Sequence, residues 1–205
     1  MIGDGAARQM RRRLRRPRIP FDLNKALFIL PNTFTVASIF FGFYAIIHAA
    51  TNTGFDALYQ SSMAIFFAVF FDGFDGRVAR LTKTQSDFGM QLDSLADAIS
   101  FGVAPAVVVF KWALWPLGHL GLFAASAFVA CGAIRLARFN VLATRGEGDP
   151  RYFVGLPIPL AASVLVACVV AHTRMFTGLP VEKHTTVAGT VLFLVGVGYF
   201  TNDAF

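Results

Sequence analysis

Charge is scarce in this sequence of 205 residues, because only 15% of them are Asp, Glu, Lys or Arg. Soluble domains carry about a quarter, so an ordinary soluble domain and a solvated disordered chain are both excluded. Cysteine is also rare, and its two copies leave no disulfide framework of a small secreted module. Apolar residues make up 56% of the chain and come in long blocks, not at the heptad spacing of a coiled coil. The composition therefore indicates an integral membrane protein.

Apolar blocks long enough to cross a bilayer occur six times. A spanning helix needs about 20 mostly apolar residues, and the predicted spans are residues 34–50, 57–80, 88–114, 118–139, 153–174 and 186–205. Residues 21–30 mix apolar and polar side chains, which predicts a short interfacial helix. The expected fold class is an all-α integral membrane protein with six transmembrane helices after that interfacial helix. We expect a basic arm over residues 1–20, one membrane domain over 21–205, and a first span that is retained, because no signal-peptide cleavage site follows the arm.

Basic residues are distributed unevenly between the two sides that these spans define. With the N-terminus in the cytoplasm, only Lys111, Arg174 and Lys183 of the 18 Lys and Arg residues fall on the opposite side. The positive-inside rule therefore places both termini in the cytoplasm. Seven arginines lie between Arg8 and Arg18, and an RNA-binding arm is one interpretation. No aromatic interleaving or nucleic-acid motif accompanies them, so we expect attraction to anionic membrane lipids and no nucleic-acid partner.

Four aspartates lie within or at the ends of the second and third spans, where a carboxylate costs about 2.5–3.5 kcal/mol on insertion scales. Asp72 and Asp75 are three residues apart, and Asp93 and Asp97 are four apart, so each pair shares one helix face. The short turn between the antiparallel spans brings the pairs opposite each other near the cytoplasmic surface. Facing carboxylates favour hard cations such as Mg²⁺, Mn²⁺ or Ca²⁺. The arrangement predicts a two-metal site of the kind used for displacement at phosphorus.

Small and cationic residues accompany the aspartates. Arg80 lies one turn beyond Gly76, where its planar fork is suited to a phosphate. Intramembrane carboxylates also serve proton relays, ion pathways and helix pairing, so an ion or proton transporter is the main alternative to an enzyme. Transport requires polar residues that continue toward the opposite side, and residues 63–69 and 103–110 contain none. Three glycines would let a bulky ligand approach the helix backbone: Gly73, Gly76 and Gly89.

One string holds all four aspartates: residues 72–97 read DGFDGRVARLTKTQSDFGMQLDSLAD and fit the pattern D-x2-D-G-x2-A-R-x8-G-x3-D-x3-D. The fixed positions are Asp72, Asp75, Gly76, Ala79, Arg80, Gly89, Asp93 and Asp97. On this string the chain resembles the CDP-alcohol phosphatidyltransferase family. The resemblance implies six membrane helices, an active site that faces the cytoplasm, and a homodimer.

Further strings resemble the integral-membrane members of this family from bacteria that use L-serine. They are LPNTFT at 30–35, DSLADAISFGVAPA at 93–106, RLARFN at 135–140 and YFVGLPIPLAA at 152–162. This resemblance implies transfer of the phosphatidyl group of CDP-diacylglycerol to the serine hydroxyl, which releases CMP, in the cytoplasmic membrane of a bacterium. The same chemistry with glycerol 3-phosphate, inositol phosphate or choline remains an alternative.

The resemblance also implies roles for individual residues. Asp97 would be the general base. Arg135 and Arg138 lie three residues apart at the cytoplasmic end of the fourth span, where anchoring is their ordinary role. The serine carboxylate needs a cation, so we expect one or both to hold the acceptor. The ligands of two Mg²⁺ or Mn²⁺ ions would be Asp72, Asp75, Asp93 and Asp97. The contacts to CDP-diacylglycerol would be Asn32, Thr35, Gly76, Arg80 and Ser86.

Overall fold

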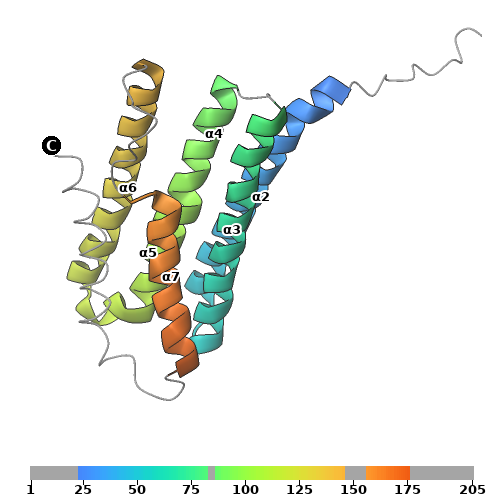
Figure 1. The fold of residues 1–205 in the computed structure, drawn as a ribbon. Helices are drawn as coiled ribbons and strands as arrows, with labels where there is room; N and C mark the ends of the chain where they lie inside the picture. The colour runs from blue at the N-terminus through green and yellow to red at the C-terminus, as the bar shows by residue number, and fades with distance from the viewer. Residues whose placement is uncertain (1–22, 83–85, 146–155, 176–205) are drawn as a thin grey trace, which may run out of the picture.

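The computed structural model of the chain describes residues 23–82, 86–145 and 156–175, and the secondary structure in these ranges is helical. The helices stand side by side in one bundle (Figure 1). Its long helices are α2 (Leu23–Thr51), α3 (Phe55–Thr82), α6 (His119–Arg145) and α7 (Ile158–Met175). A continuous helical path between α3 and α6 consists of α4 (Asp87–Asp97), the π-helix η1 (Ala98–Val103), α5 (Ala104–Val109), the π-helix η2 (Phe110–Leu114) and the 3-10 helix η3 (Trp115–Leu117).

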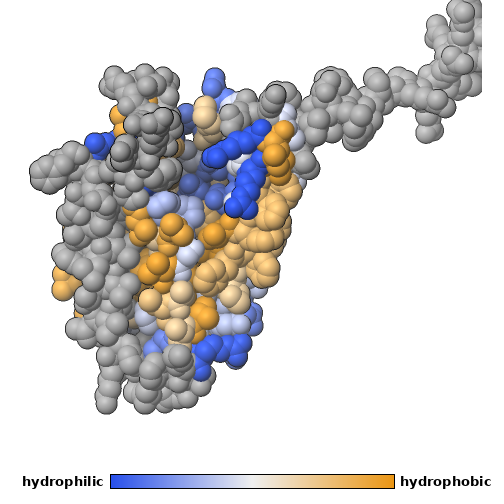
Figure 2. Space-filling model, in the orientation of Figure 1, coloured by the Kyte–Doolittle hydropathy of each residue, from blue (hydrophilic) through white to orange (hydrophobic). Residues whose placement is uncertain are grey.

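Within the described ranges, four helical stretches are long and apolar enough to cross a membrane: Asn32–Thr51, Phe55–Thr82, Asp87–Leu117 and His119–Leu142. The stretch Ile158–Arg174 is apolar but shorter. These five overlap the first five predicted spans, whereas the sixth, 186–205, and the basic arm lie outside the described residues. Figure 2 shows hydrophilic residues at both ends of the described surface and apolar surface between them. Such a surface is expected of a multi-pass membrane protein.

Helix α2 differs from the sequence-based prediction, which separated an interfacial helix over 21–30 from a first span over 34–50. The structure has one continuous helix from Leu23 to Thr51. Its first turns are inclined to the rest (Figure 1). Pro31 lies within this helix, and a proline removes one backbone hydrogen bond and bends a helix without ending it. The two predicted elements are therefore joined.

Helix α5 occupies the centre of the bundle. It contacts α2, α3, α6 and α7, and Ala104, Ala106 and Val108 are among its buried residues. A helix that is apolar all round is typical of such a central position. The outer helices are thereby held at fixed positions around the path from α4 to η3, which carries two of the four aspartates.

Helix α2 approaches η1 closely at Gly42. A β-carbon on Gly42 would lie 2.5 Å from Ser100 Oγ and 2.7 Å from Ser100 Cα. The Ser100 hydroxyl donates to the backbone oxygen of Ser38 at 3.0 Å, one turn earlier in α2. Glycine is therefore required at position 42, because backbone as well as side chain stands where a larger residue would project.

We predict that Gly42→Ala destabilises the protein by about 1–3 kcal/mol, the usual cost of overpacking a closed site. Gly102→Ala is the matched control, because the nearest atom to its added β-carbon is Val129 Cγ1 at 4.0 Å. Thermal unfolding of both variants in the same detergent measures the effect. Equal midpoints for the two variants would contradict the close approach at Gly42.

Candidate active site

Three carboxylates converge at one end of the bundle. Asp72 and Asp75 come from the last turns of α3, and Asp93 comes from α4. One oxygen from each lies within 4.8 Å of the other two. Asp75 is buried, and Asp72 and Asp93 are half-buried. Three oxygen ligands at this spacing fit a hard divalent cation, which would also offset the charge that these groups carry together.

Asp97, one turn after Asp93 in α4, lies outside this group of three. Its carboxyl group lies close enough to the Asp72 carboxyl group for the two to interact electrostatically. Its Oδ1 atom is buried and has no hydrogen-bond partner among the described residues. The predicted set of four thus divides into three converging carboxylates and one adjacent carboxylate with an unused buried oxygen. That division allows Asp97 a chemical role different from that of the other three.

Thr35 connects α2 to this group. Its hydroxyl donates a hydrogen bond of 2.8 Å to Asp75 Oδ2, and both residues are buried. A hydrogen bond to a charged acceptor is stronger than a neutral one and fixes the orientation of the carboxylate. Thr35, which the family resemblance linked to the lipid nucleotide, therefore orients a carboxylate in this structure.

The N-terminus of α4 gathers three more of the expected residues. Ser86 caps the helix, and its Oγ accepts a hydrogen bond of 3.0 Å from the backbone N–H of Gly89. A β-carbon on Gly89 would lie 3.1 Å from Ser86 Oγ and 3.5 Å from Asn32 Oδ1. Asn32 and Ser86 therefore meet over Gly89. The start of a helix favours anions, because its first N–H groups lack intrahelical partners.

The adjoining face of α3 is open. A β-carbon added to Gly76 would meet no atom within 4 Å, and the same is true of Gly73. Arg80, one turn after Gly76, is exposed. Hydrophilic surface lies at this upper end of the bundle in Figure 2. A ligand with phosphate groups therefore has room beside the carboxylates. Arg80, one helix turn from Gly76, offers a positive charge to those phosphates.

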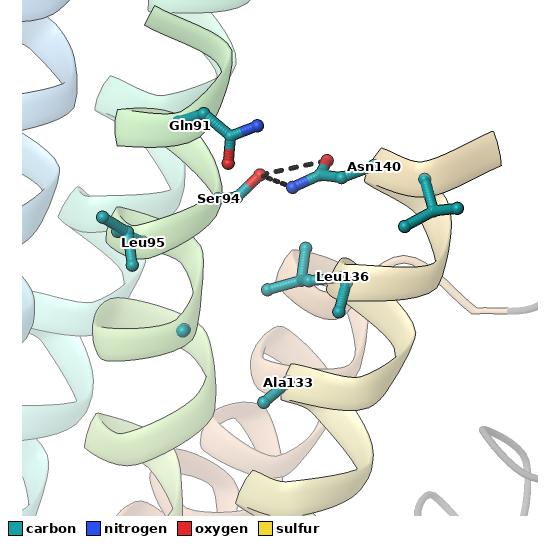
Figure 3. Close-up of a pocket in the computed structure, with 9 residues that line it drawn as sticks. Gln91, Ser94, Leu95, Ala133, Leu136 and Asn140 are labelled. Atoms are coloured by element: carbon teal, nitrogen blue, oxygen red, sulfur yellow. Dashed lines mark hydrogen bonds between the residues drawn. The ribbon is translucent and has the colours of Figure 1, made fainter. Parts of the chain in front are cut away.

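A groove of about 430 Å³ separates α4 from α6 on another side of α4 (Figure 3). Asn140 Nδ2 donates a hydrogen bond of 2.9 Å to Ser94 Oγ across it. Ser94 follows Asp93, so this bond places the end of α6 level with the carboxylates. Nothing in the sequence singles out this pair, because their partnership depends on how two helices pack. The groove is otherwise mostly apolar, with Leu95, Ala133 and Leu136 among its lining residues.

The two arginines of α6 differ in their surroundings. Arg135 is half-buried and lies two turns after the buried Phe128 on the same face of the helix. Arg138 is exposed. Both precede Asn140 in α6, and the bond from Asn140 to Ser94 puts this part of α6 near the level of the carboxylates. Of the two, Arg135 lies on the helix face that is directed into the bundle.

Comparison with characterised sequences gives relatives that share one name, CDP-diacylglycerol–serine O-phosphatidyltransferase. The protein from Helicobacter pylori is 45% identical over 151 residues, which are 72% of this chain and 60% of that relative. The protein from Methanocaldococcus jannaschii is 45% identical over 115 residues, or 56% of this chain and 53% of the relative. The protein from Saccharomyces cerevisiae is 39% identical over 156 residues, or 71% and 56%. The chain thus spans 53–60% of the length of these relatives.

The family match covers the converging carboxylates and the helices that hold them. A sequence profile named CDP-alcohol phosphatidyltransferase matches residues 28–198, which include all the candidate site residues. The match extends over most of the chain and agrees with the aspartate pattern of residues 72–97. The chain therefore belongs to the CDP-alcohol phosphatidyltransferase family.

Proposed function

We propose that this chain transfers the phosphatidyl group of CDP-diacylglycerol to the hydroxyl of L-serine and releases phosphatidylserine and CMP. The observation that carries the proposal is the convergence of Asp72, Asp75 and Asp93 at one end of a membrane bundle. Family membership supports the donor, and the shared name of the relatives supports serine as the acceptor.

Asp72, Asp75 and Asp93 are the residues that would hold a divalent cation, and Asp97 would contribute to a second. The donor set suits Mg²⁺ or Mn²⁺, and we propose two ions per site. Bound there, the ions would supply charge stabilisation to the phosphate oxygens. Thr35 supports this role from α2, because its hydrogen bond fixes the carboxylate of Asp75.

Asp97 is the proposed general base. The position of Asp97 beside Asp72 but outside the group of three supports a role as proton acceptor in addition to cation binding. The serine hydroxyl gives its proton to Asp97, and its oxygen forms a bond to the phosphorus that carries diacylglycerol. The bond from that phosphorus to the bridging oxygen breaks, and CMP leaves with the bond's electrons. A base is needed because a neutral alcohol is a weak nucleophile.

The donor headgroup is proposed to lie between the open face of α3 and the N-terminus of α4. Gly76 leaves room for the diphosphate, and Arg80 supplies a cation. Ser86 and Asn32 stand at the helix N-terminus beside it. Positioning and electrostatic stabilisation would then supply most of the rate acceleration, as in phosphoryl transfer generally.

We predict that Arg135→Ala raises the KM for serine about tenfold or more, because a guanidinium–carboxylate hydrogen bond contributes about 1.5–3 kcal/mol. Arg138→Ala is the comparison variant and should raise it less, since Arg138 is exposed and Arg135 faces the bundle. Steady-state CMP release at varied serine concentration measures both. An unchanged KM in both variants would exclude the arginines from acceptor binding.

The remaining proposals concern the surroundings of the site. We propose that the carboxylate end of the bundle faces the cytoplasm of a bacterium, because Arg77 and Arg80 flank it in α3. The basic arm is proposed to bind anionic lipids, and the chain to form a homodimer.

The proposed reaction is tested with purified protein, CDP-diacylglycerol and Mn²⁺ or Mg²⁺, supplied in turn with serine, glycerol 3-phosphate, inositol phosphate or choline. CMP release that depends on serine is the expected result. Release only with another alcohol would change the acceptor but keep the chemistry. No release with any of them would overturn the proposal and favour the transporter alternative.

A further inference from the structure

Ser38 is a completely buried hydroxyl close to the carboxylates. It lies in α2 one turn after Thr35, which donates to Asp75, and its exposed fraction is 0%. Its Oγ has no hydrogen-bond partner among the described residues. A buried polar atom without a partner costs about 1–3 kcal/mol. A partner other than the described side chains is therefore expected beside it.

The register of α2 against α4 and η1 indicates which residues lie level with Ser38. Asn32 lies near Gly89, and Gly42 lies against Ser100, so the two helical segments run in the same direction. Ser100 also donates to the backbone oxygen of Ser38. One turn before the Gly42–Ser100 contact, Ser38 is level with Ala96 and Asp97.

Asp97 provides the matching atom. Its Oδ1 is the other buried oxygen at this level that has no partner among the described residues. Ala96, next to it, is also completely buried and has only a methyl side chain, so it supplies no hydrogen-bond partner to either oxygen. Buried waters commonly join polar atoms of this kind, with about three hydrogen bonds each.

We propose that Ser38 is a positioning residue for Asp97, whose Oδ1 it holds through one buried water. Such a bridge satisfies both orphaned oxygens and fixes the carboxylate so that its other oxygen is directed toward Asp72 and the acceptor. The inference rests on the proposed function, in which Asp97 accepts the serine proton. It gives α2 two contacts with the carboxylates, Thr35 to Asp75 and Ser38 to Asp97.

Ser38→Ala tests the inference, and Ser62→Ala is its matched control. Ser62 is also 0% exposed, and its Oγ also lacks a partner among the described residues. It lies in α3 ten residues before Asp72, which is about 15 Å along the helix axis. The two substitutions are therefore alike in chemistry and burial and differ in distance from Asp97. Ser38→Cys, which fills the site with a somewhat larger group that donates only weakly, separates hydrogen bonding from the loss of packing.

We expect Ser38→Ala to lower kcat about tenfold, the factor that one lost hydrogen bond implies. The KM for CDP-diacylglycerol and the unfolding midpoint should stay close to those of Ser62→Ala, which should retain wild-type kcat. Ser38→Cys should also be slow. Wild-type kcat in Ser38→Ala, normal kcat in Ser38→Cys, equal losses in Ser38→Ala and Ser62→Ala, or a change confined to KM would each overturn the inference.

Failure of the proposed function is distinguishable in the same experiment, because it affects the wild-type protein. A wild-type protein that uses another acceptor leaves the comparison of Ser38 with Ser62 intact, with that acceptor as the substrate. A wild-type protein with no transferase activity overturns both the function and the role of Ser38.

Discussion

Asp97→Asn should abolish serine-dependent CMP release and lower kcat by about 10³-fold. The amide has nearly the same shape as the carboxylate but takes no proton from the serine hydroxyl, and a lost general base usually costs about 10²–10⁴-fold in rate. Binding of CDP-diacylglycerol should largely persist, because Asp97 lies outside the three carboxylates that converge. CMP release at saturating serine and direct binding of labelled CDP-diacylglycerol measure the two effects separately.

Asp56→Asn is the control for this substitution. Asp56 is in the first turn of α3, at the opposite end of that helix from Asp72 and Asp75, so its loss should leave turnover unchanged. Near-normal turnover in Asp97→Asn would remove Asp97 from the role of base. Loss of donor binding together with turnover would instead indicate that Asp97 serves mainly in cation and donor binding, and not as the base.

Removal of divalent cations should eliminate essentially all turnover, and added Mn²⁺ or Mg²⁺ should restore it. The physical reason is the charge of the site: Asp72, Asp75 and Asp93 each place an oxygen within 4.8 Å of the others, and a phosphate donor would add negative charge. Without a cation, the carboxylates would repel the substrate that they are proposed to bind. CMP release after treatment with a chelator, followed by titration with each metal, measures the dependence.

Metal binding can be measured without turnover. Mn²⁺ titration of the substrate-free protein should show weaker binding in Asp93→Asn than in Asp97→Asn, because only Asp93 belongs to the group of three. Equal Mn²⁺ affinity in the wild-type protein and Asp93→Asn, or full activity in the chelator, would show that the carboxylates serve another purpose.

Helical period and apolar length account for the parts of this site that the sequence predicted. Residues three or four apart share a helix face, so spacing along the chain is enough to pair Asp72 with Asp75 and Asp93 with Asp97. Apolar length alone located the described spans, because a bilayer requires about 20 apolar residues. Both rules act within a single helix, where spacing along the chain determines spacing in space.

Those two rules do not predict which residues of different helices contact each other. Thr35 bonds to Asp75 across 40 residues, and Ser94 bonds to Asn140 across 46. Such pairs depend on the rotation and register of two helices, which side-chain packing determines. The period of one helix gives the face that a residue occupies but not the partner that it meets.

The helix geometry after Asp97 also could not be predicted from the spacing of apolar residues. The sequence predicted a span over residues 88–114 without its internal geometry, and the structure changes to a π-helix within it at Ala98–Val103 and again at Phe110–Leu114. A π-helix bonds each residue to one five positions away, so it rotates everything beyond it relative to an α-helix. Ser100, which lies against Gly42, is within the first of these π-helices, and π-helical turns are frequent at functional sites.

The most direct test of the account follows labelled L-serine into lipid. Wild-type protein, CDP-diacylglycerol and Mn²⁺ should incorporate labelled serine into phosphatidylserine in equal molar amount to the CMP released, and Asp97→Asn should do neither. CMP release without labelled lipid would mean that water or another alcohol attacks the phosphorus. That result, or equal labelling by Asp97→Asn, would contradict the transfer of phosphatidyl groups to serine at these four aspartates.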